Sequence, residues 1–434
     1  MFGYYLDLAV RSLKRNPVLT ALMVLAIGLG IGASMTMLTV LHVMGGDPLP
    51  GRSAHLYRPF LNPLPLSYKL KPEDIGHGPN AALTWPDAKA LLDAHKGVQQ
   101  AAMARGNLVA HSTQPGVHPE SVVGSFTTRD FFTMFGVPFI AGDPWSEQAD
   151  AGGAPVVVLT QKLARKLFGK ERALGKVVQL GKHGFRVVGV VKDWHPEPLF
   201  YAISASFNEA DQFFLPLSTA AHMDLDNTWG SAWGDDKMSP TSPTTSWLNF
   251  WVRLDTPRQV AGYRRFLVNY SAQQKAAGRF ERPPDDARLY GLMQWLHREG
   301  LVPTDVLLQA WLALGFLFVC MVNIIALLLA KFLRSGGEIS VRRALGATRY
   351  NIFVQFGIES GLIGLAGGLL GVGIAELGLW SVRQRPDDYA QLAHMDGQML
   401  VMTVVLAIAV SILAGLLPAW RACRIAPALQ LKTL

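Results

Sequence analysis

The 434-residue chain has only two cysteines, Cys320 and Cys423. Neither lies in the hydrophilic region formed by residues 45–304. We therefore expect this region to be held together by core packing instead of disulfides, which a domain of that length can supply. An exported domain without cysteine is common in bacterial envelopes and less common on animal cell surfaces.

Motifs for catalysis are also missing. The sequence has no HExxH, no GxSxG and no clustered His/Cys pattern. The segment GKERALGK at 169–176 resembles a phosphate-binding loop, but it has five residues between its glycines instead of four. Val177 also stands where Ser or Thr would hold magnesium. We predict that the chain is not an enzyme and has no catalytic, cofactor-binding or metal-binding residues.

Charge is scarce in four long segments. A bilayer core about 30 Å thick requires about 20 helical residues, and the expected transmembrane helices are residues 18–44, 305–331, 352–380 and 398–418. The first is too long for a cleaved signal peptide, so we expect an uncleaved anchor. In the third, Glu359 is expected near the cytoplasmic end and Glu376 near the outer end, where a charge costs less.

Basic residues flank these spans on one side of a four-span topology, and such residues are retained in the cytoplasm. They are Arg11, Lys14 and Arg15 before the first span; Lys331, Arg334, Arg342, Arg343 and Arg349 between the second and third; and Arg421, Arg424 and Lys432 after the fourth. We expect a multi-pass protein of the bacterial inner membrane with both termini cytoplasmic. The remaining segments are then a cytoplasmic amphipathic helix (1–17), a periplasmic domain (45–304), a cytoplasmic loop (332–351), a periplasmic loop (381–397) and a cytoplasmic tail (419–434).

The outer region has a mixed pattern of helices and strands. β-Branched runs predict strands at 156–159, 177–180, 185–191 and 248–254. Capping patterns predict helices at 85–95, 161–168 and 257–280. The predicted fold is an α-helical membrane protein with four transmembrane helices and a large α+β extracytoplasmic domain between the first and second. Trp229, Trp233, Trp247 and Trp251 are read as core residues; the alternative is an exposed surface for a hydrophobic ligand or the membrane interface.

The loop between the second and third spans has an amphipathic pattern. On a helix, Val341, Ala344, Leu345 and Thr348 would form one narrow apolar face. Such a helix could dock into a groove of a soluble partner. The alternative is a helix that lies on anionic lipid.

Several segments resemble one family. The sequence of residues 338–371, EISVRRALGATRYNIFVQFGIESGLIGLAGGLLG, is similar to the cytoplasmic loop and third span of MacB/FtsX-type permeases of ABC transporters. The tail at 418–432 resembles the segment after their last span, and residues 130–145, 156–169 and 184–194 resemble the MacB-like periplasmic core.

The resemblance implies a permease that works by mechanotransmission, in which a separate cytoplasmic ATPase dimer moves the periplasmic domains of two paired permeases. ATP and Mg would bind the partner ATPase, since this sequence shows no fused ATPase. The coupling helix carried over from the family comprises Glu338, Val341, Arg342, Arg343, Ala344, Leu345, Gly346, Ala347 and Thr348. Candidate helix-packing positions, with GxxxG-like spacing, are Gly28, Gly32, Gly364, Gly368 and Gly371.

Two functions remain open at this point. The first is export or extrusion of a substrate from the periplasm or the membrane, which the size of the outer domain favours. The second is an FtsX-like regulatory role that controls a periplasmic cell-wall hydrolase. The substrate, the identity of the second permease (the same chain or a related one) and the involvement of a periplasmic adaptor and outer-membrane duct are left undetermined; nucleic acid is not an expected partner.

Overall fold

The computed structural model describes residues 2–69, 82–112, 118–169, 171–202, 210–223, 230–233, 239–300, 302, 304–334, 345–384, 394–395 and 397–424. The chain divides into two compact units. Met1–Met44 and Val302–Leu434 form the first, called the membrane unit below, and Gly45–Leu301 form the second, called the outer unit.

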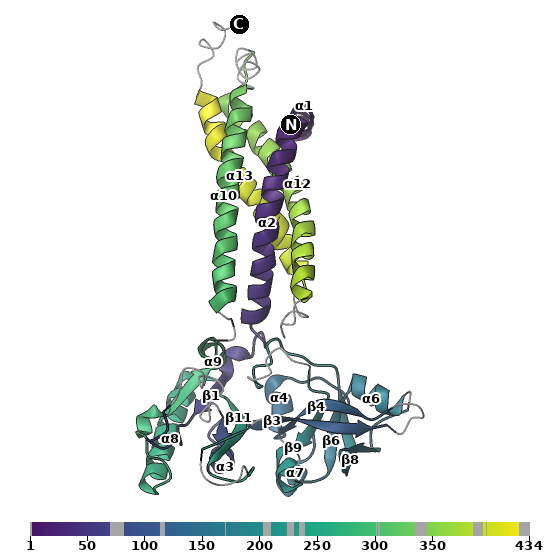
Figure 1. The fold of residues 1–434 in the computed structure, drawn as a ribbon, viewed down its shortest axis with the longest axis vertical. Coiled ribbons are helices and arrows are strands. Elements are labelled where there is room, and N and C mark those ends of the chain that lie inside the picture. Colours follow the sequence, from purple (N-terminus) through teal and green to yellow (C-terminus); the bar gives the residue numbers. More distant parts are fainter. Residues whose placement is uncertain are drawn as a thin grey trace. The chain divides into compact units, whose positions relative to one another are not determined.

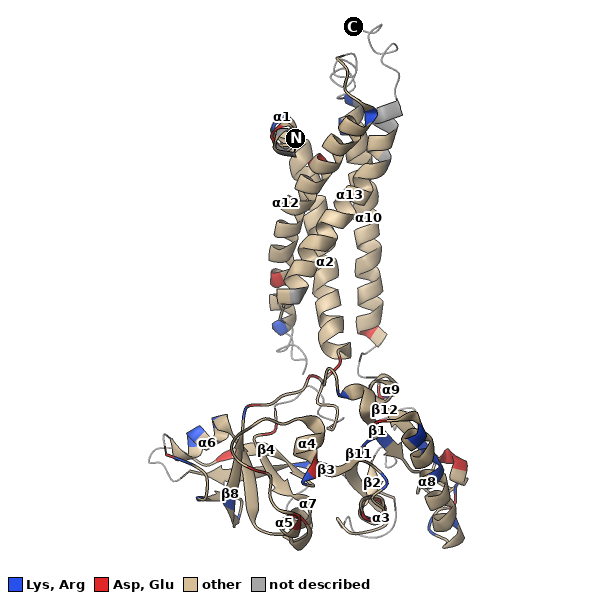
Figure 2. Cartoon of the chain, turned by 180° about the vertical axis from the view of Figure 1, so that it is seen from behind, with Lys and Arg blue, Asp and Glu red and all other residues tan. Residues whose placement is uncertain are grey.

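The membrane unit contains four helices that are long and apolar enough to cross a membrane. They are α2 (Pro17–Gly45), α10 (Thr304–Arg334), α12 (Arg349–Arg383) and α13 (Gly397–Arg424), and α1 (Phe2–Arg15) precedes them. Figure 1 shows the long helices side by side, with α1 beside the bundle near the end at which α10 and α13 finish. Figure 2 shows charged residues near the ends of this bundle and few along its length.

The span helices extend beyond the expected ends. The third begins at Arg349 because Thr348 caps it, and the fourth continues through Pro418 to Arg424. Proline inside a helix removes one backbone hydrogen bond, so the sequence suggested an end at Pro418 that the helix does not have. The separate α1 agrees with the expected amphipathic helix: Ala9 is buried, while Arg11 and Lys14 are exposed.

The outer unit is an α+β domain, as expected from the sequence. Its strands are β1 (Leu56–Phe60), β2 (Leu83–Thr84), β3 (Gln99–His111), β4 (Glu120–Thr127), β5 (Phe139–Gly142), β6 (Val156–Thr160), β7 (Val177–Leu180), β8 (His183–Val191), β9 (Phe213–Pro216), β10 (Ser231–Ala232), β11 (Thr245–Arg253) and β12 (Arg288–Gly291). Its helices are α3 (Trp85–Asp93), α4 (Asp130–Phe135), α5 (Glu147–Gly152), α6 (Gln161–Phe168), α7 (Leu217–His222), α8 (Pro257–Ala276) and α9 (Leu292–Arg298), with 3-10 turns η1 (Ser53–His55) and η4 (Pro284–Asp286). The predicted strands and helices named above are all present, with small shifts at their ends.

The strands form one mixed sheet in the order β12-β1-β11-β3-β4-β9-β6-β8-β5. Strand β3 pairs with β11 on one side and β4 on the other, so it joins the two halves of the sheet. The β4–β9 and β6–β8 pairs are parallel, and the other pairs are antiparallel.

Side chains alternate between two cores because successive residues of a strand point to opposite faces. In β3, Ala102 and Ala104 belong to a core with residues of α3, α6, α7 and α8, whereas Ala101 and Met103 belong to one with residues of α4 and α9. Both faces are therefore covered, and every residue of β6 is buried. Trp247 and Trp251 are buried in these cores, which agrees with the core interpretation for both. Trp233 is half-buried, and Trp229 lies outside the described residues.

Candidate functional site

The loop that follows α10 and precedes α12 lies at one end of the membrane unit, called the loop end below. α10 finishes there at Arg334 and α12 begins there at Arg349. Five of the predicted coupling residues lie outside the described residues: Glu338, Val341, Arg342, Arg343 and Ala344. The other four, Leu345, Gly346, Ala347 and Thr348, are described.

The prediction that one helix runs through Leu345 to Thr348 was wrong. Leu345 and Gly346 form a turn, and Gly346 has φ +100°, a left-handed conformation that ends a right-handed helix. Thr348 has extended backbone, and its Oγ1 accepts a hydrogen bond from the Asn351 backbone N–H at 3.2 Å. Thr348 therefore caps α12 and does not continue an apolar face from the loop.

Leu345 is the most exposed large apolar residue at the loop end, with 83% of its surface accessible. Tyr350, in the first turn of α12, is 73% exposed. The described part of the chain leaves most of the surface of both side chains uncovered. Their side chains are available to a protein that covers the loop end.

A buried polar cluster lies behind this surface. The Lys331 ammonium donates a hydrogen bond to Glu359 Oε1 and forms an ion pair with it. The Ser12 hydroxyl donates to the same oxygen at 2.8 Å. Glu359 and Lys331 are only 1% and 2% exposed. The cluster thus joins α1, α10 and α12.

Burial makes this cluster important for helix position. An ionised carboxylate or ammonium away from water is strongly disfavoured unless it is paired and hydrogen-bonded. Sliding α10 along α12 would separate Lys331 from Glu359 and expose each charge to an apolar environment. The two helices that bracket the loop are therefore held at one relative position.

Glu359 and Glu376 differ in their surroundings, although both lie in α12. Glu376 has a half-exposed side chain whose carboxylate lies 3.8 Å from Arg383 Nη2. Such an exposed pair contributes little to stability. Only Glu359 is placed to link separate helices.

The glycine positions all face helices of the same chain. An added Cβ at Gly28 or Gly32 would lie 2.8 Å or 2.6 Å from side-chain atoms of α12. At Gly364 and Gly368 it would meet α13, and at Gly371 it would meet α2. These glycines therefore allow close approach of α2, α12 and α13 within one chain.

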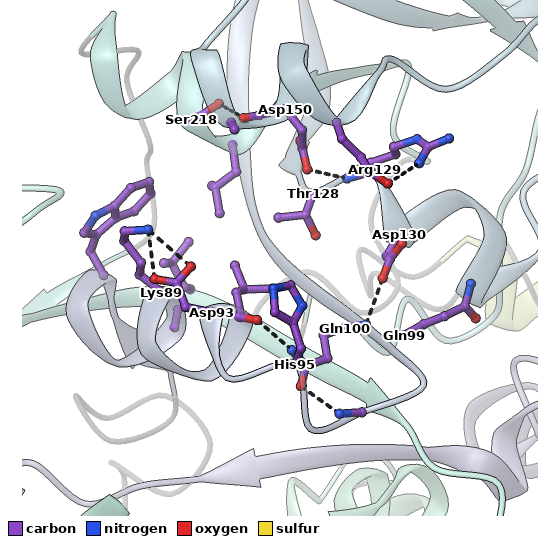
Figure 3. Close-up of a pocket in the computed structure, with 18 of the residues that line it drawn as sticks. Lys89, Asp93, His95, Gln99, Gln100, Thr128, Arg129, Asp130, Asp150 and Ser218 are labelled. Carbon is purple, nitrogen blue, oxygen red and sulfur yellow. Dashed lines mark hydrogen bonds and ion pairs between the residues drawn. The ribbon is translucent and has the colours of Figure 1, made fainter.

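The outer unit contains a separate cleft of about 680 Å³. It is lined by α3, α5, α7 and the start of β3 (Figure 3). Its charged side chains are matched within the wall: Lys89 pairs with Asp93, Arg129 with Glu147, and the Asp130 carboxylate accepts from the Gln100 backbone N–H. Burial raises the pKa of Asp150, while hydrogen bonds from the Arg129 backbone and the Trp145 indole oppose that shift. Because the charged residues labelled in Figure 3 have partners within the wall, they do not indicate which class of ligand the cleft would bind.

Metal and phosphate chemistry finds no further support in the part of the chain that the structure describes. No group of three or more His, Cys, Asp or Glu residues is placed there to hold a metal ion. The segment that resembles a phosphate-binding loop lies between α6 and β7, where Gly169 ends α6 with φ +64°. Its Lys176 pairs with Glu171. Gly169 and Gly175, which both have positive φ, therefore provide the backbone conformation of turns.

Sequence reasoning missed the Lys331–Glu359 pair. It treated Lys331 as a flanking charge and Glu359 as a residue close to the membrane surface. A usable signal was present, because each is a charged residue within or at the end of an apolar span and their signs are opposite. Ser12 carried no such signal.

Comparison with protein families identifies both units. The sequence model of the MacB-like periplasmic core domain matches residues 20–265. The model of the FtsX-like permease C-terminal domain matches residues 311–427. Together the two matches include most of α2, most of the outer unit, most of α10, the loop end and the last two spans.

Curated relatives agree with this result. The chain is 24% identical to the macrolide export ATP-binding/permease protein MacB of Syntrophobacter fumaroxidans, over 99% of this chain and 64% of the relative. It is 26% identical to MacB 2 of Aeromonas hydrophila, over 71% of this chain and 42% of the relative. The chain thus spans less than two thirds of these proteins. It is also 22% identical to the ABC transporter permease YknZ of Bacillus subtilis, over 97% of this chain and 96% of the relative.

Solved structures with some similarity come from outer domains. The periplasmic region of MacB from Actinobacillus actinomycetemcomitans matches with a TM-score of 0.37 and 16% identity, over 57% of this chain and 93% of that one. The extracellular domain of YknZ matches with a TM-score of 0.33 and 17% identity, over 50% of this chain and 95% of that one.

Proposed function

The chain belongs to the family that joins a MacB-like periplasmic core domain to an FtsX-like permease domain, and from this premise we propose that it is the permease subunit of an ABC transporter that works by mechanotransmission. In this proposal a separate ATPase dimer, which binds ATP and Mg, docks at the loop end on the cytoplasmic side. Its closure moves the helices, and the outer unit responds by exporting or extruding a substrate. The orientation rests on the basic residues at the loop end.

The observation that carries the proposal is the buried cluster of Ser12, Lys331 and Glu359. A force applied to the loop reaches α10 at Arg334 and α12 at Arg349. Because Lys331 and Glu359 hold these helices together, they would move as one body and take α1 with them. In the sequence, α2 leads directly into the outer unit and α10 follows directly from it. Movement of α2 and α10 would therefore apply force to both ends of the outer unit.

Pairing with a second permease is supported by the outward face of α10. This helix is the least buried of the four spans, and it exposes Trp311, Phe318 and Val322. The Asn323 side chain is also exposed within this apolar span and has no hydrogen-bond partner among the described residues. An amide that faces lipid is disfavoured, whereas an amide on a partner helix can both donate to it and accept from it.

The docking surface is tested by Leu345→Asp. Because Leu345 is 83% exposed, the substitution should leave the fold of the permease intact. At an interface it would bury a charge without a partner, which costs several kcal/mol and weakens binding by orders of magnitude. The expected result is loss of ATPase co-purification and of permease-stimulated ATP hydrolysis.

Leu66→Asp is the matched control because Leu66 is 64% exposed and lies in the outer unit. It should retain the ATPase fully. Normal ATPase binding and stimulated hydrolysis in Leu345→Asp would refute docking at the loop end. The export and regulatory alternatives are then separated by whether the proteins recovered with the intact complex include an adaptor and outer-membrane duct or a cell-wall hydrolase.

A further inference from the structure

An apolar notch of about 460 Å³ lies where α1 meets the spans. It is lined by residues of α1, α2 and α12: Val10, Leu13, Lys14, Pro17, Thr20, Ala21, Val24 and Leu362. Apart from Lys14 and Thr20, these side chains are apolar. The notch is far larger than the space that one water molecule occupies. In a membrane it would be filled by hydrocarbon.

The walls of the notch are held in place. α1 ends at Arg15, Asn16 forms the bend, and α2 begins at Pro17. The Thr20 hydroxyl lies within hydrogen-bond distance of the Leu13 carbonyl oxygen at 3.1 Å and of the Asn16 carbonyl oxygen at 3.0 Å. These contacts fix the angle between α1 and α2.

α1 is also fixed on its other side. The Ser12 hydroxyl donates to Glu359 of α12 at 2.8 Å. α1 cannot therefore close over the notch without breaking this bond to a buried carboxylate. The opening is preformed and does not depend on a ligand.

One cation at the notch has no counter-charge. Lys14 is exposed and has no ion-pair partner among the described residues. Arg11, on the same helix, is paired with Asp7 at 2.8 Å. Lys14 thus combines with the apolar lining to present a positive charge at the mouth of a hydrocarbon-sized space.

We propose that this notch binds one anionic phospholipid, with an acyl chain against Leu13, Ala21 and Leu362 and the phosphate at the Lys14 ammonium. The apolar lining accepts any acyl chain, so selection between lipids comes from Lys14. A zwitterionic lipid offers the same tail with no net charge. Because α1 is bonded to Glu359, the lipid would stabilise the polar cluster that holds α10 and α12. The binding claim itself does not depend on the proposed transport function.

The test uses the purified full chain, stripped of native lipid, in neutral detergent. Phosphatidylglycerol is titrated with phosphatidylcholine as the zwitterionic control, and retained lipid is counted by native mass spectrometry. One basic residue near an anionic lipid surface accounts for about a fivefold change in affinity. We therefore expect Lys14→Gln to bind phosphatidylglycerol about fivefold more weakly and to lose the preference over phosphatidylcholine.

Two further variants locate the site. Arg11→Gln is the matched control, because Arg11 lies on the same helix and does not line the notch; it should bind like the unmodified chain. Ala21→Trp adds bulk at an exposed position of the lining and should prevent retention of either lipid. Equal binding by Lys14→Gln and Arg11→Gln would overturn the role of Lys14. Unchanged retention in Ala21→Trp would overturn the notch as the site.

The headgroup alone gives a final discrimination. Glycerol phosphate should compete weakly, because it lacks the acyl chain that fills the notch. Full displacement of phosphatidylglycerol by glycerol phosphate at matched concentration would mean that the site binds a soluble anion, and the lipid assignment would fail.

Discussion

Each unit contains a carboxylate buried among hydrogen-bond donors, and the two differ in what they connect. In the outer unit Asp211 accepts hydrogen bonds from Arg105 Nε at 2.7 Å, from the Ser125 hydroxyl and from the Tyr201 hydroxyl at 2.9 Å. Arg105 and Ser125 belong to β3 and β4, which are already joined by a ladder of backbone pairs. In the membrane unit Glu359 joins three helices that rely on side-chain contacts. Asp211 therefore reinforces strands that are already joined, whereas Glu359 helps to join helices that have no backbone pairing.

Glycine is used differently in the two units as well. In the outer unit Gly136 and Gly153 have positive φ and end α4 and α5, so they provide a backbone conformation that other residues avoid. In the membrane unit Gly32 and Gly368 lie inside helices and provide space for a neighbouring helix. A side chain at the first kind of site strains the backbone, and one at the second kind separates helices.

The largest expected effect comes from neutralising the two carboxylates. Glu359→Gln removes the charge that compensates the Lys331 ammonium and should destabilise the membrane unit by about 3–5 kcal/mol. Asp211→Asn likewise removes the charge that compensates the buried Arg105 guanidinium and should destabilise the outer unit by about 3–5 kcal/mol. Each effect should be confined to its own unit.

Cysteine makes the measurement specific to one unit. In a Cys423→Ser background, the buried Cys320 reports unfolding of the membrane unit through a thiol-reactive dye, and the outer unit has no cysteine. Tryptophan fluorescence mainly follows the outer unit, which holds most of the tryptophans. The double variant Lys331→Met with Glu359→Gln should recover much of the loss. Equal dye transitions in Glu359→Gln and Asp211→Asn would contradict the comparison.

A smaller effect is expected from glycine substitution. An added Cβ at Gly32 would lie 2.6 Å from Ile374 Cγ2, so Gly32→Ala must push α2 from α12 at a cost of about 1–3 kcal/mol. An added Cβ at Gly357 would have no atom of another helix within 4 Å, so Gly357→Ala should be neutral or stabilising by up to about 1 kcal/mol. The Cys320 assay should therefore show Gly32→Ala to be less stable than the parent and Gly357→Ala to be as stable or more stable. Stabilisation by both substitutions would show that helix propensity outweighs packing at Gly32.

The smallest effect concerns pH and the outer unit. Burial raises the pKa of Asp150 in the folded protein, so the folded state binds this proton more tightly than the unfolded state does. This contribution to the free energy of unfolding is therefore greatest at low pH and is lost as pH rises through the folded pKa. The stability of the parent relative to Asp150→Asn should therefore fall as pH rises above about 3.9, the ordinary pKa of an Asp carboxyl. A difference that stays constant as pH rises above that value would show that Asp150 is not perturbed.

Much of the architecture could be predicted from local patterns. Uncharged runs indicated the four spans, and β-branched runs indicated strands such as β6 and β8. Thr84, Thr160 and Thr256 cap α3, α6 and α8. These features depend on neighbours a few residues away, which a sequence displays directly. The prediction for the end of the coupling segment was wrong because Thr348 fits two patterns in the sequence: the apolar face of one helix and the N-cap of the next.

The sequence by itself determined that the chain has four membrane spans, an outer α+β domain without disulfides and a basic loop end, because hydrophobicity and charge act on each segment separately. Only the tertiary structure decided which residues meet. Lys331 and Glu359 are 28 residues apart, and Ser12 and Glu359 are 347 apart. Their contact depends on how α1, α10 and α12 pack. The glycines likewise had spacing suited to packing in the sequence, but only the folded bundle showed that their neighbours are helices of the same chain.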